Sequence, residues 1–222
     1  MRVLYHLWLS PQCRKVRLAL TEKSLPFDMQ VEKVWERHDE FLALNPAGEV
    51  PVLVEEDGTA IADSVAIVEY LEDTYPEKPL LGLTPAARAE VRRLSQWFDV
   101  KFAREVSDNL VGEKVLKKFL GLGQPDSTAI RAGHANMKTH LEYVSWLADR
   151  RRFLAGDFFS LADIAAAAHL SAVDYIGDVP WDDYPRAKEW YVRIKSRPSF
   201  RPVLADHIPG LRPPTHYADL DF

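Results

Sequence analysis

The stretch VLYHLWLSPQCRKVRLAL, residues 3–20, predicts a strand, a turn and a helix in immediate succession. Residues 3–7 are β-branched, aromatic or aliphatic, a composition typical of strands. The dipeptide Ser10-Pro11 interrupts this run, and apolar residues then recur with helical spacing from Val16 to Leu20. The chain therefore begins with a strand followed directly by a helix.

The residues after this stretch extend the pattern into an α/β domain. Leu25-Pro26 ends the helix, residues 27–34 alternate as a second strand, and residues 39–44 predict a short helix. Two short strands flank the turn signal Asp57-Gly58, which predicts an antiparallel hairpin, and Asp63-Ser64 caps one further helix. The predicted order over residues 1–76 is βαβαββα.

The rest of the chain predicts helices only. Residues 77–85 contain two prolines and are interpreted as a linker to an all-helical domain over residues 86–200. The expected helices cover about residues 86–120, 127–150, 161–175 and 184–196. Residues 201–222 are proline-rich, which disfavours a continuous helix, and are interpreted as a C-terminal extension and tail.

The bulk composition narrows the possible function classes. The net charge of -5 gives no overall attraction to nucleic acid. Because Cys13 is the sequence's single cysteine, an intrachain disulfide is impossible, which fits a reducing compartment. No apolar run approaches the length of a membrane span, and a strand pattern begins at once, which leaves no room for a signal peptide. We expect a cytoplasmic protein without membrane insertion or nucleic-acid binding.

Three separated segments together resemble the glutathione transferase superfamily. They are SPQCRKVR at residues 10–17, EVPVL at residues 49–53 and the pair Asp63-Ser64. The resemblance implies a thioredoxin-like N-terminal domain, with Pro51 as a cis-proline, and a helical C-terminal domain. The segments FLAGD at residues 153–157 and SLAD at residues 160–163 resemble the signature of that helical domain, and Ser160 with Asp163 predicts a capping box.

The resemblance also implies a glutathione site, which we interpret as vestigial. Its residues would be Ser10 at the thiol, Val50 and Pro51 along the peptide, and Asp63 and Ser64 at the γ-glutamyl group. Ser10 equally fits a purely structural role in the turn, and Cys13 fits a packed helix residue. Glu49 stands where many enzymes of the superfamily carry a non-acidic residue, and a carboxylate facing the glycyl carboxylate of glutathione is unfavourable. We expect no cofactor, with glutathione doubtful, and no metal.

The C-terminal residues resemble a narrower group within the superfamily. Residues 213–222, PPTHYADLDF, together with residues 2–6, RVLYH, and 109–115, NLVGEKV, are similar to alphaproteobacterial glutathione-transferase-like proteins that bind the tubulin homologue FtsZ. This resemblance implies a homodimeric, non-catalytic cell-division regulator that binds FtsZ filaments and promotes their curvature at the division site. The alternative is a glutathione S-transferase that conjugates glutathione to small electrophiles, with Ser10 as its catalytic residue.

Several residues are candidates for contacting the partner. The tail alternates apolar anchors with acids, which suits an extended peptide docking on FtsZ or on a second division protein; the alternative is that the tail packs on its own domain. Trp35 fits either an interface anchor or a partly buried loop residue. Charged side chains at the tip of the two longest helices fit either a partner-binding surface or a surface that only contacts solvent. The candidate partner-binding residues are Trp35, Glu113, Arg131, Tyr217, Asp219, Asp221 and Phe222.

Overall fold

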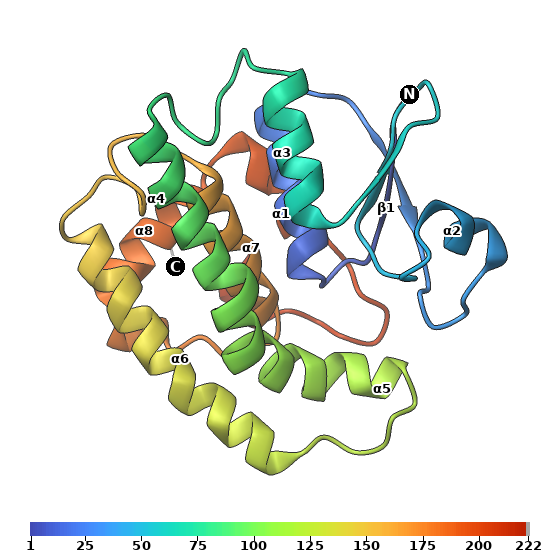
Figure 1. Cartoon of the computed structure of the whole chain (residues 1–222). Helices are drawn as coiled ribbons and strands as arrows, with labels where there is room; N and C mark the ends of the chain where they lie inside the picture. The colour runs from blue at the N-terminus through green and yellow to red at the C-terminus, as the bar shows by residue number, and fades with distance from the viewer. Residues whose placement is uncertain (221–222) are drawn as a thin grey trace. The chain divides into compact units, whose positions relative to one another are not determined.

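The computed structural model describes residues 1–220 and divides the chain into two compact units, Met1–Leu80 and Leu81–Phe222. The first unit combines a four-stranded mixed sheet with helices, and the second is helical (Figure 1). The predicted fold class, a thioredoxin-like domain followed by an all-α domain, is therefore confirmed.

The first unit has the predicted βαβαββα order. Its elements are β1 (Val3–His6), α1 (Pro11–Glu22), β2 (Asp28–Val31), α2 (Asp39–Leu44), β3 (Val52–Val54), β4 (Ala60–Ala62) and α3 (Ser64–Thr74). The sheet order is β2-β1-β3-β4, with β1 and β2 parallel and the other pairs antiparallel. In this register Leu4 pairs with Met29 on one side and with Leu53 on the other.

The core of this unit follows from the apolar spacing in α1 and α3. Cys13, Val16 and Leu20 are completely buried on α1, and Ile67 and Leu71 are completely buried on α3. These spacings of three and four residues place the buried side chains of each helix on one face. Only four residues separate the end of β1 from the start of α1, so the position of the sheet limits where that helix can begin.

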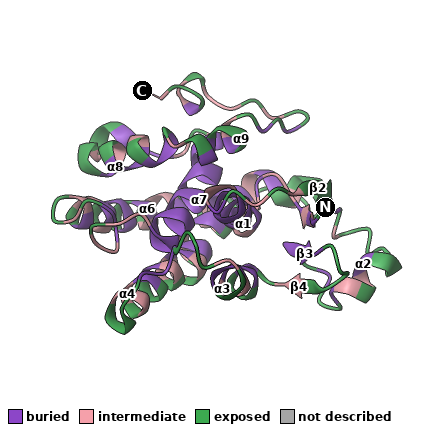
Figure 2. Ribbon diagram, turned by 90° about the horizontal axis from the view of Figure 1, so that it is seen from above, coloured by how far each residue is buried: buried purple, intermediate pink, exposed green. Residues whose placement is uncertain are grey.

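The second unit consists of helical segments and connecting loops. They are α4 (Pro85–Gln96), η1 (Trp97–Leu116), α5 (Lys117–Phe119), α6 (Ser127–Ala148), α7 (Leu161–Tyr175), η2 (Trp181–Asp183), α8 (Pro185–Lys195), η3 (Pro198–Phe200), α9 (Arg201–Leu204) and η4 (Thr215–Tyr217). All fifteen residues of α7 are buried, so this helix forms the centre of the unit (Figure 2). The expected capping box is confirmed at its start, where Asp163 accepts the backbone N–H of Ser160 at 3.1 Å.

One predicted helix differs in kind from the expectation. We expected one α-helix over about residues 86–120, but the structure has a π-helix, η1, in its middle. The buried positions Phe98, Phe102, Val106, Leu110 and Val115 lie four or five residues apart. A helix of 3.6 residues per turn would rotate some of these positions toward solvent, whereas the wider turn of a π-helix keeps them on one face.

The helix pair η1 and α6 is closely packed around one glycine. A Cβ placed on Gly133 of α6 would lie 2.9 Å from side-chain atoms of Leu110 on η1. That separation is shorter than carbon contacts in a packed protein interior, which are about 3.5–4.0 Å. The absence of a side chain at residue 133 therefore sets how closely these two helices approach.

Candidate functional site

Ser10, the candidate thiol ligand, begins α1 as its N-cap. Its hydroxyl oxygen accepts the backbone N–H of Cys13 at 3.2 Å, and its O–H donates to the side chain of Gln12 at 3.3 Å. This satisfies one of the helix's otherwise unpaired N–H groups. The hydroxyl donor is therefore engaged within its own turn, and this geometry matches the structural role of Ser10.

The other residues of the expected glutathione site gather at the ends of β3 and β4. The Val50–Pro51 bond is cis, as the resemblance implied. The backbone N–H of Asp63 donates to the carbonyl of Pro51 at 3.3 Å, which holds the two segments together. Asp63 has a positive φ of 76° and caps α3 by accepting the N–H groups of Val65 and Ala66, while Ser64 is buried.

Two further residues of the first unit bear on catalysis. Glu49 is exposed beside Val50, so a carboxylate stands at the open side of this segment. Burial raises the pKa of the Cys13 thiol to about 11, which keeps the thiol protonated near neutral pH. Cys13 is thus a packed core residue and has no thiolate for nucleophilic chemistry.

Trp35 lies in the connection between β2 and α2, and 40% of its surface is exposed. The backbone N–H of Glu36 donates to the carbonyl of Lys33 at 2.8 Å, so residues 33–36 form a turn with Trp35 at its third position. The large indole is therefore presented at the tip of a defined turn.

Glu113 and Arg131 lie at the same end of the η1–α6 pair. The Glu113 carboxylate accepts the backbone N–H of Asp126 at 2.7 Å and the Nζ of Lys117 at 2.8 Å. These contacts lower the pKa of Glu113, the backbone hydrogen bond first. Arg131 donates to the hydroxyl of Thr128 at 3.1 Å and is exposed. Glu113 therefore also secures the loop before α6.

Exposed apolar side chains surround this helix end, and sequence reasoning missed them. Their exposed fractions, from 37% to 64%, are large for apolar residues, and basic Lys117 and Lys118 lie between them in sequence. The exposed apolar residues are Leu116, Phe119, Leu120 and Leu122.

Tyr217, expected to reach a partner, is instead completely buried in its own unit. Its ring lies edge-on to Tyr175 at a centroid distance of 5.0 Å, and its hydroxyl donates to the carbonyl of Val203 at 3.3 Å. The ring is too apolar to remain in water when such a site is available on the same unit. We correct the interpretation of Tyr217 from a partner contact to an internal anchor of the tail.

A buried charge cluster holds the residue before Tyr217. The His216 ring contacts the carboxylate of Asp174 at 2.9 Å, and the Nζ of Lys195 donates to the His216 carbonyl at 2.8 Å. Asp174 is fully buried and also accepts the indole N–H of Trp181 at 2.8 Å. Burial lowers the pKa of Lys195 to about 8. Sequence reasoning missed this anchor because its partners are distant along the chain.

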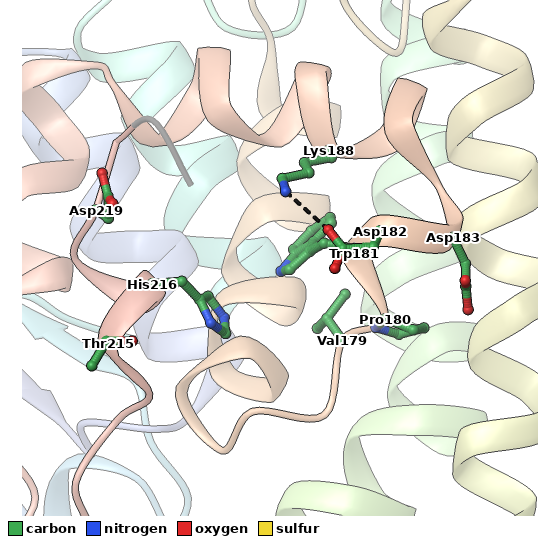
Figure 3. A pocket seen from close by; sticks show the side chains of 9 residues that line it. All are labelled: Val179, Pro180, Trp181, Asp182, Asp183, Lys188, Thr215, His216 and Asp219. Carbon is green, nitrogen blue, oxygen red and sulfur yellow. Dashed lines mark hydrogen bonds and ion pairs between the residues drawn. The ribbon is translucent and has the colours of Figure 1, made fainter.

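The anchored tail forms one wall of a pocket of about 660 Å³ (Figure 3). Asp219, a predicted tail residue, lines this pocket opposite the segment η2 and the start of α8. Lys188 is paired with Asp182 at 3.2 Å. The predicted tail residues Asp221 and Phe222 lie outside the described residues. The pocket is lined by Val179, Pro180, Trp181, Asp182, Asp183, Lys188, Thr215, His216 and Asp219.

Within residues 1–220, no group of three or more histidine, cysteine or acidic side chains is placed to hold a metal ion. Among the same residues, no helix is both long and apolar enough to cross a membrane.

Comparison with known proteins gives matches along the whole chain. Residues 4–79 match the model of the glutathione S-transferase N-terminal domain, and residues 123–198 match that of the C-terminal domain. FtsZ-localized protein A of Caulobacter vibrioides is 54% identical over 225 residues, covering 100% of this chain and 98% of that protein.

Two solved structures are similar over the full length. A glutathione S-transferase from Rhodospirillum rubrum F11 is 62% identical with a TM-score of 0.98, and both chains are covered completely. FzlA from C. crescentus is 53% identical with a TM-score of 0.96, covering 100% of this chain and 99% of that one. The motifs, the fold and these matches agree, and the chain belongs to the glutathione S-transferase family.

Proposed function

We propose that this protein is a non-catalytic regulator of cell division that binds FtsZ filaments at the division site in the cytoplasm and promotes their curvature. The observation that carries the proposal is the 54% identity to FtsZ-localized protein A, which extends over the entire chain. A match that includes both domains and the tail supports a shared role beyond a shared fold.

The geometry of the first unit favours binding over catalysis. The Ser10 hydroxyl is engaged in capping α1, and the Glu49 carboxylate is exposed beside the Val50–Pro51 segment. A glutathione carboxylate approaching Glu49 would meet like charge, which lowers affinity unless a cation intervenes. The engaged Ser10 hydroxyl is poorly placed to activate a glutathione thiol, and the Glu49 carboxylate disfavours glutathione binding.

We assign FtsZ binding to two surfaces, one in each unit. The first is the Trp35 turn, because large exposed aromatic side chains are typical interface anchors. The second is the helix end that carries Glu113, Arg131 and the exposed apolar residues 116–122. We further propose that the protein acts as a homodimer, and that the residues after Tyr217 bind FtsZ or a second division protein.

Co-pelleting with FtsZ polymerised by GTP tests the proposal. Trp35→Ala is expected to reduce FtsZ affinity at least about tenfold, in the range of interface hot spots. Trp146→Ala is the matched control, since Trp146 is 48% exposed on α6; light scattering reports the oligomeric mass of both variants. If Trp35→Ala co-pellets with FtsZ as strongly as the wild type does, the proposed role of this turn is contradicted.

A truncation after Tyr217 tests the tail separately, because it removes residues 218–222 and keeps the buried anchor. Weaker binding of FtsZ or of a second division protein is expected. Unchanged division and unchanged FtsZ binding in cells that carry the truncation would contradict a role for the tail.

The second candidate function is glutathione conjugation, favoured by the similarity to the 62% identical glutathione S-transferase from Rhodospirillum rubrum. A calorimetric titration with glutathione, followed by a chlorodinitrobenzene assay, separates the two functions. Turnover that disappears in Ser10→Ala would establish the enzyme. Saturable FtsZ binding, with no heat of glutathione binding in the calorimeter, supports the regulator.

A further inference from the structure

The turn that carries Trp35 is closed twice. The backbone N–H of Glu36 donates to the Lys33 carbonyl, and the side chains of the same two residues form an ion pair, with Lys33 Nζ 2.9 Å from a carboxylate oxygen of Glu36. The next residue, Arg37, has a φ of 50°, a region that side-chain-bearing residues seldom adopt. The chain is therefore turned sharply on the C-terminal side of Trp35.

His38 connects this turn to the sheet. One ring nitrogen, Nδ1, lies 2.9 Å from a carboxylate oxygen of Glu32, and the other, Nε2, lies 3.0 Å from a carboxylate oxygen of Glu36. Glu32 is buried, and its backbone N–H donates to the carbonyl of His6 at 3.1 Å at the end of β1. The path from the sheet to the Trp35 turn thus runs Glu32, His38, Glu36.

Both nitrogens of His38 face carboxylates, so only the protonated ring can donate on both sides. A neutral ring carries one N–H and can donate to only one of the two carboxylates. The bridge is consequently complete only with the imidazolium form. Loss of that proton removes one of the two links and the attraction of both ion pairs.

The surrounding charges favour the protonated ring on balance. The carboxylates near it are Glu32 on the strand side, Glu36 in the turn, and Asp39 and Glu40 in the first turn of α2. The opposing cations are Lys33, paired with Glu36, and Arg37, whose guanidinium lies near Gly48. The N-terminus of α2, which His38 precedes, also opposes a positive charge.

The pKa of His38 is raised above its ordinary value of 6.5, chiefly by the hydrogen bond to Glu32 and then by the charges of Glu32 and Glu36. A raised pKa in the folded state means that the bridge contributes fully below pH 6.5 and is lost as pH rises through the raised value. The Trp35 turn is then held more firmly in mildly acidic than in alkaline solution.

We propose that His38 is a positioning residue for Trp35: by bridging Glu32 and Glu36 it fixes the turn of residues 33–36 to the sheet and makes the presentation of the Trp35 indole depend on pH. The fixed turn is an ordered anchor, and an anchor ordered before binding loses less conformational entropy in a complex. The binding consequence rests on the proposed function, whereas the coupling of Trp35 to His38 does not.

The coupling is tested on the full chain alone, by following the indole N–H resonance of Trp35 and the ring resonances of His38 by NMR from pH 5.5 to 9. The Trp35 resonance is assigned by its disappearance in Trp35→Phe. We expect it to shift with the same midpoint as His38, above pH 6.5, and to become independent of pH in this range in His38→Gln. The control His207→Gln, which changes an exposed histidine of the second unit, should leave the curve unchanged.

A Trp35 resonance that does not follow the His38 midpoint, or that titrates unchanged in His38→Gln, would overturn the proposal. Glu36→Gln supplies a second variant, because it keeps the turn backbone but removes one carboxylate. It should lower the His38 midpoint. An unchanged midpoint in Glu36→Gln also overturns the bridge.

FtsZ affinity then tests the consequence for binding. At pH 6.5, His38→Gln is expected to weaken FtsZ binding about two- to tenfold, as immobilising one mobile side chain typically costs, and His207→Gln should bind as wild type. Coupled titration with no FtsZ binding by the wild type would refute the proposed function and leave the positioning role standing. FtsZ binding by the wild type without a coupled titration would support the proposed function and refute the positioning role.

Discussion

Replacing Tyr217 by alanine tests whether the tail is anchored from within. A tyrosine side chain buries about 150–250 Å², and at about 25 cal/mol per Å² this corresponds to about 4–6 kcal/mol. A compact denatured state reduces the figure by about a tenth to two-fifths, and alanine retains the Cβ atom. We therefore expect Tyr217→Ala to lower the free energy of unfolding of the helical unit by about 3 kcal/mol.

The assay combines urea unfolding with hydrogen exchange of residues 205–220. A loss of about 3 kcal/mol corresponds to a decrease in Tm of about 6–12 °C for a chain of this size. Peptides that contain Ile208 and Leu211 should exchange faster, because the hydroxyl of Tyr175 holds the backbone of both residues and itself packs on Tyr217. The first unit should exchange as in the wild type.

Tyr217→Phe is the matched control, since it keeps the ring and removes only the hydroxyl. Its hydrogen bond to Val203 is long, at 3.3 Å, so a loss of only about 0.5 kcal/mol is expected, at the low end of neutral hydrogen bonds. If Tyr217→Ala keeps the wild-type Tm and the wild-type exchange of the tail, then the anchor contributes nothing and the reasoning is refuted.

Three further predictions concern buried or paired groups. Asp163→Ala should lower the free energy of unfolding by about 3 kcal/mol or more in urea, because it removes the acceptor of the buried N–H groups of Leu154, Ser160 and the Trp190 indole; a loss below about 1 kcal/mol would contradict this. The Cys13 thiol, with its pKa raised to about 11, should react with Ellman's reagent at pH 8 only after unfolding in urea, and rapid reaction of the folded protein would refute its burial. Hydrogen bonds from Arg93 and Arg151 lower the pKa of Glu90 to about 2, so the stabilising contribution of Glu90 is present above pH 4.5 and is lost as pH falls toward 2. Glu90→Gln should therefore reduce the decrease of the urea unfolding midpoint between pH 5 and pH 3. An unchanged pH dependence in the variant would contradict this contribution.

The parts of the fold that depend on local sequence were predictable. The hairpin around Asp57-Gly58, the N-cap of Ser10 and the capping box of Ser160 with Asp163 all rest on residues within a few positions of one another. The π-helix was not predicted, although its signal is present in the spacing of Phe98, Phe102 and Val106. A spacing of four residues also fits one face of an ordinary α-helix over a short stretch, so it does not by itself distinguish the two helix types.

The candidate site was less predictable because its contacts join distant residues. The burial of Tyr217 depends on Tyr175 and Val203, and the placement of His216 depends on Asp174 and Lys195. No local pattern marks these pairs, so the sequence alone did not decide whether the tail binds a partner or packs on its own domain. Trp35 was located correctly in a loop, but the bridge from His38 requires the exact path of that loop.

The anchoring of Tyr217 limits how far the next described residues can move from the helical unit. Asp219 lies two residues after the anchor, and a fully extended chain spans at most about 3.6 Å per residue. The Cα atom of Asp219 therefore stays within about 7 Å of the Cα atom of Tyr217. A tether this short confines any molecule that binds at Asp219 to a small volume beside the helical unit, where a second weak contact acts at an effective concentration on the order of millimolar.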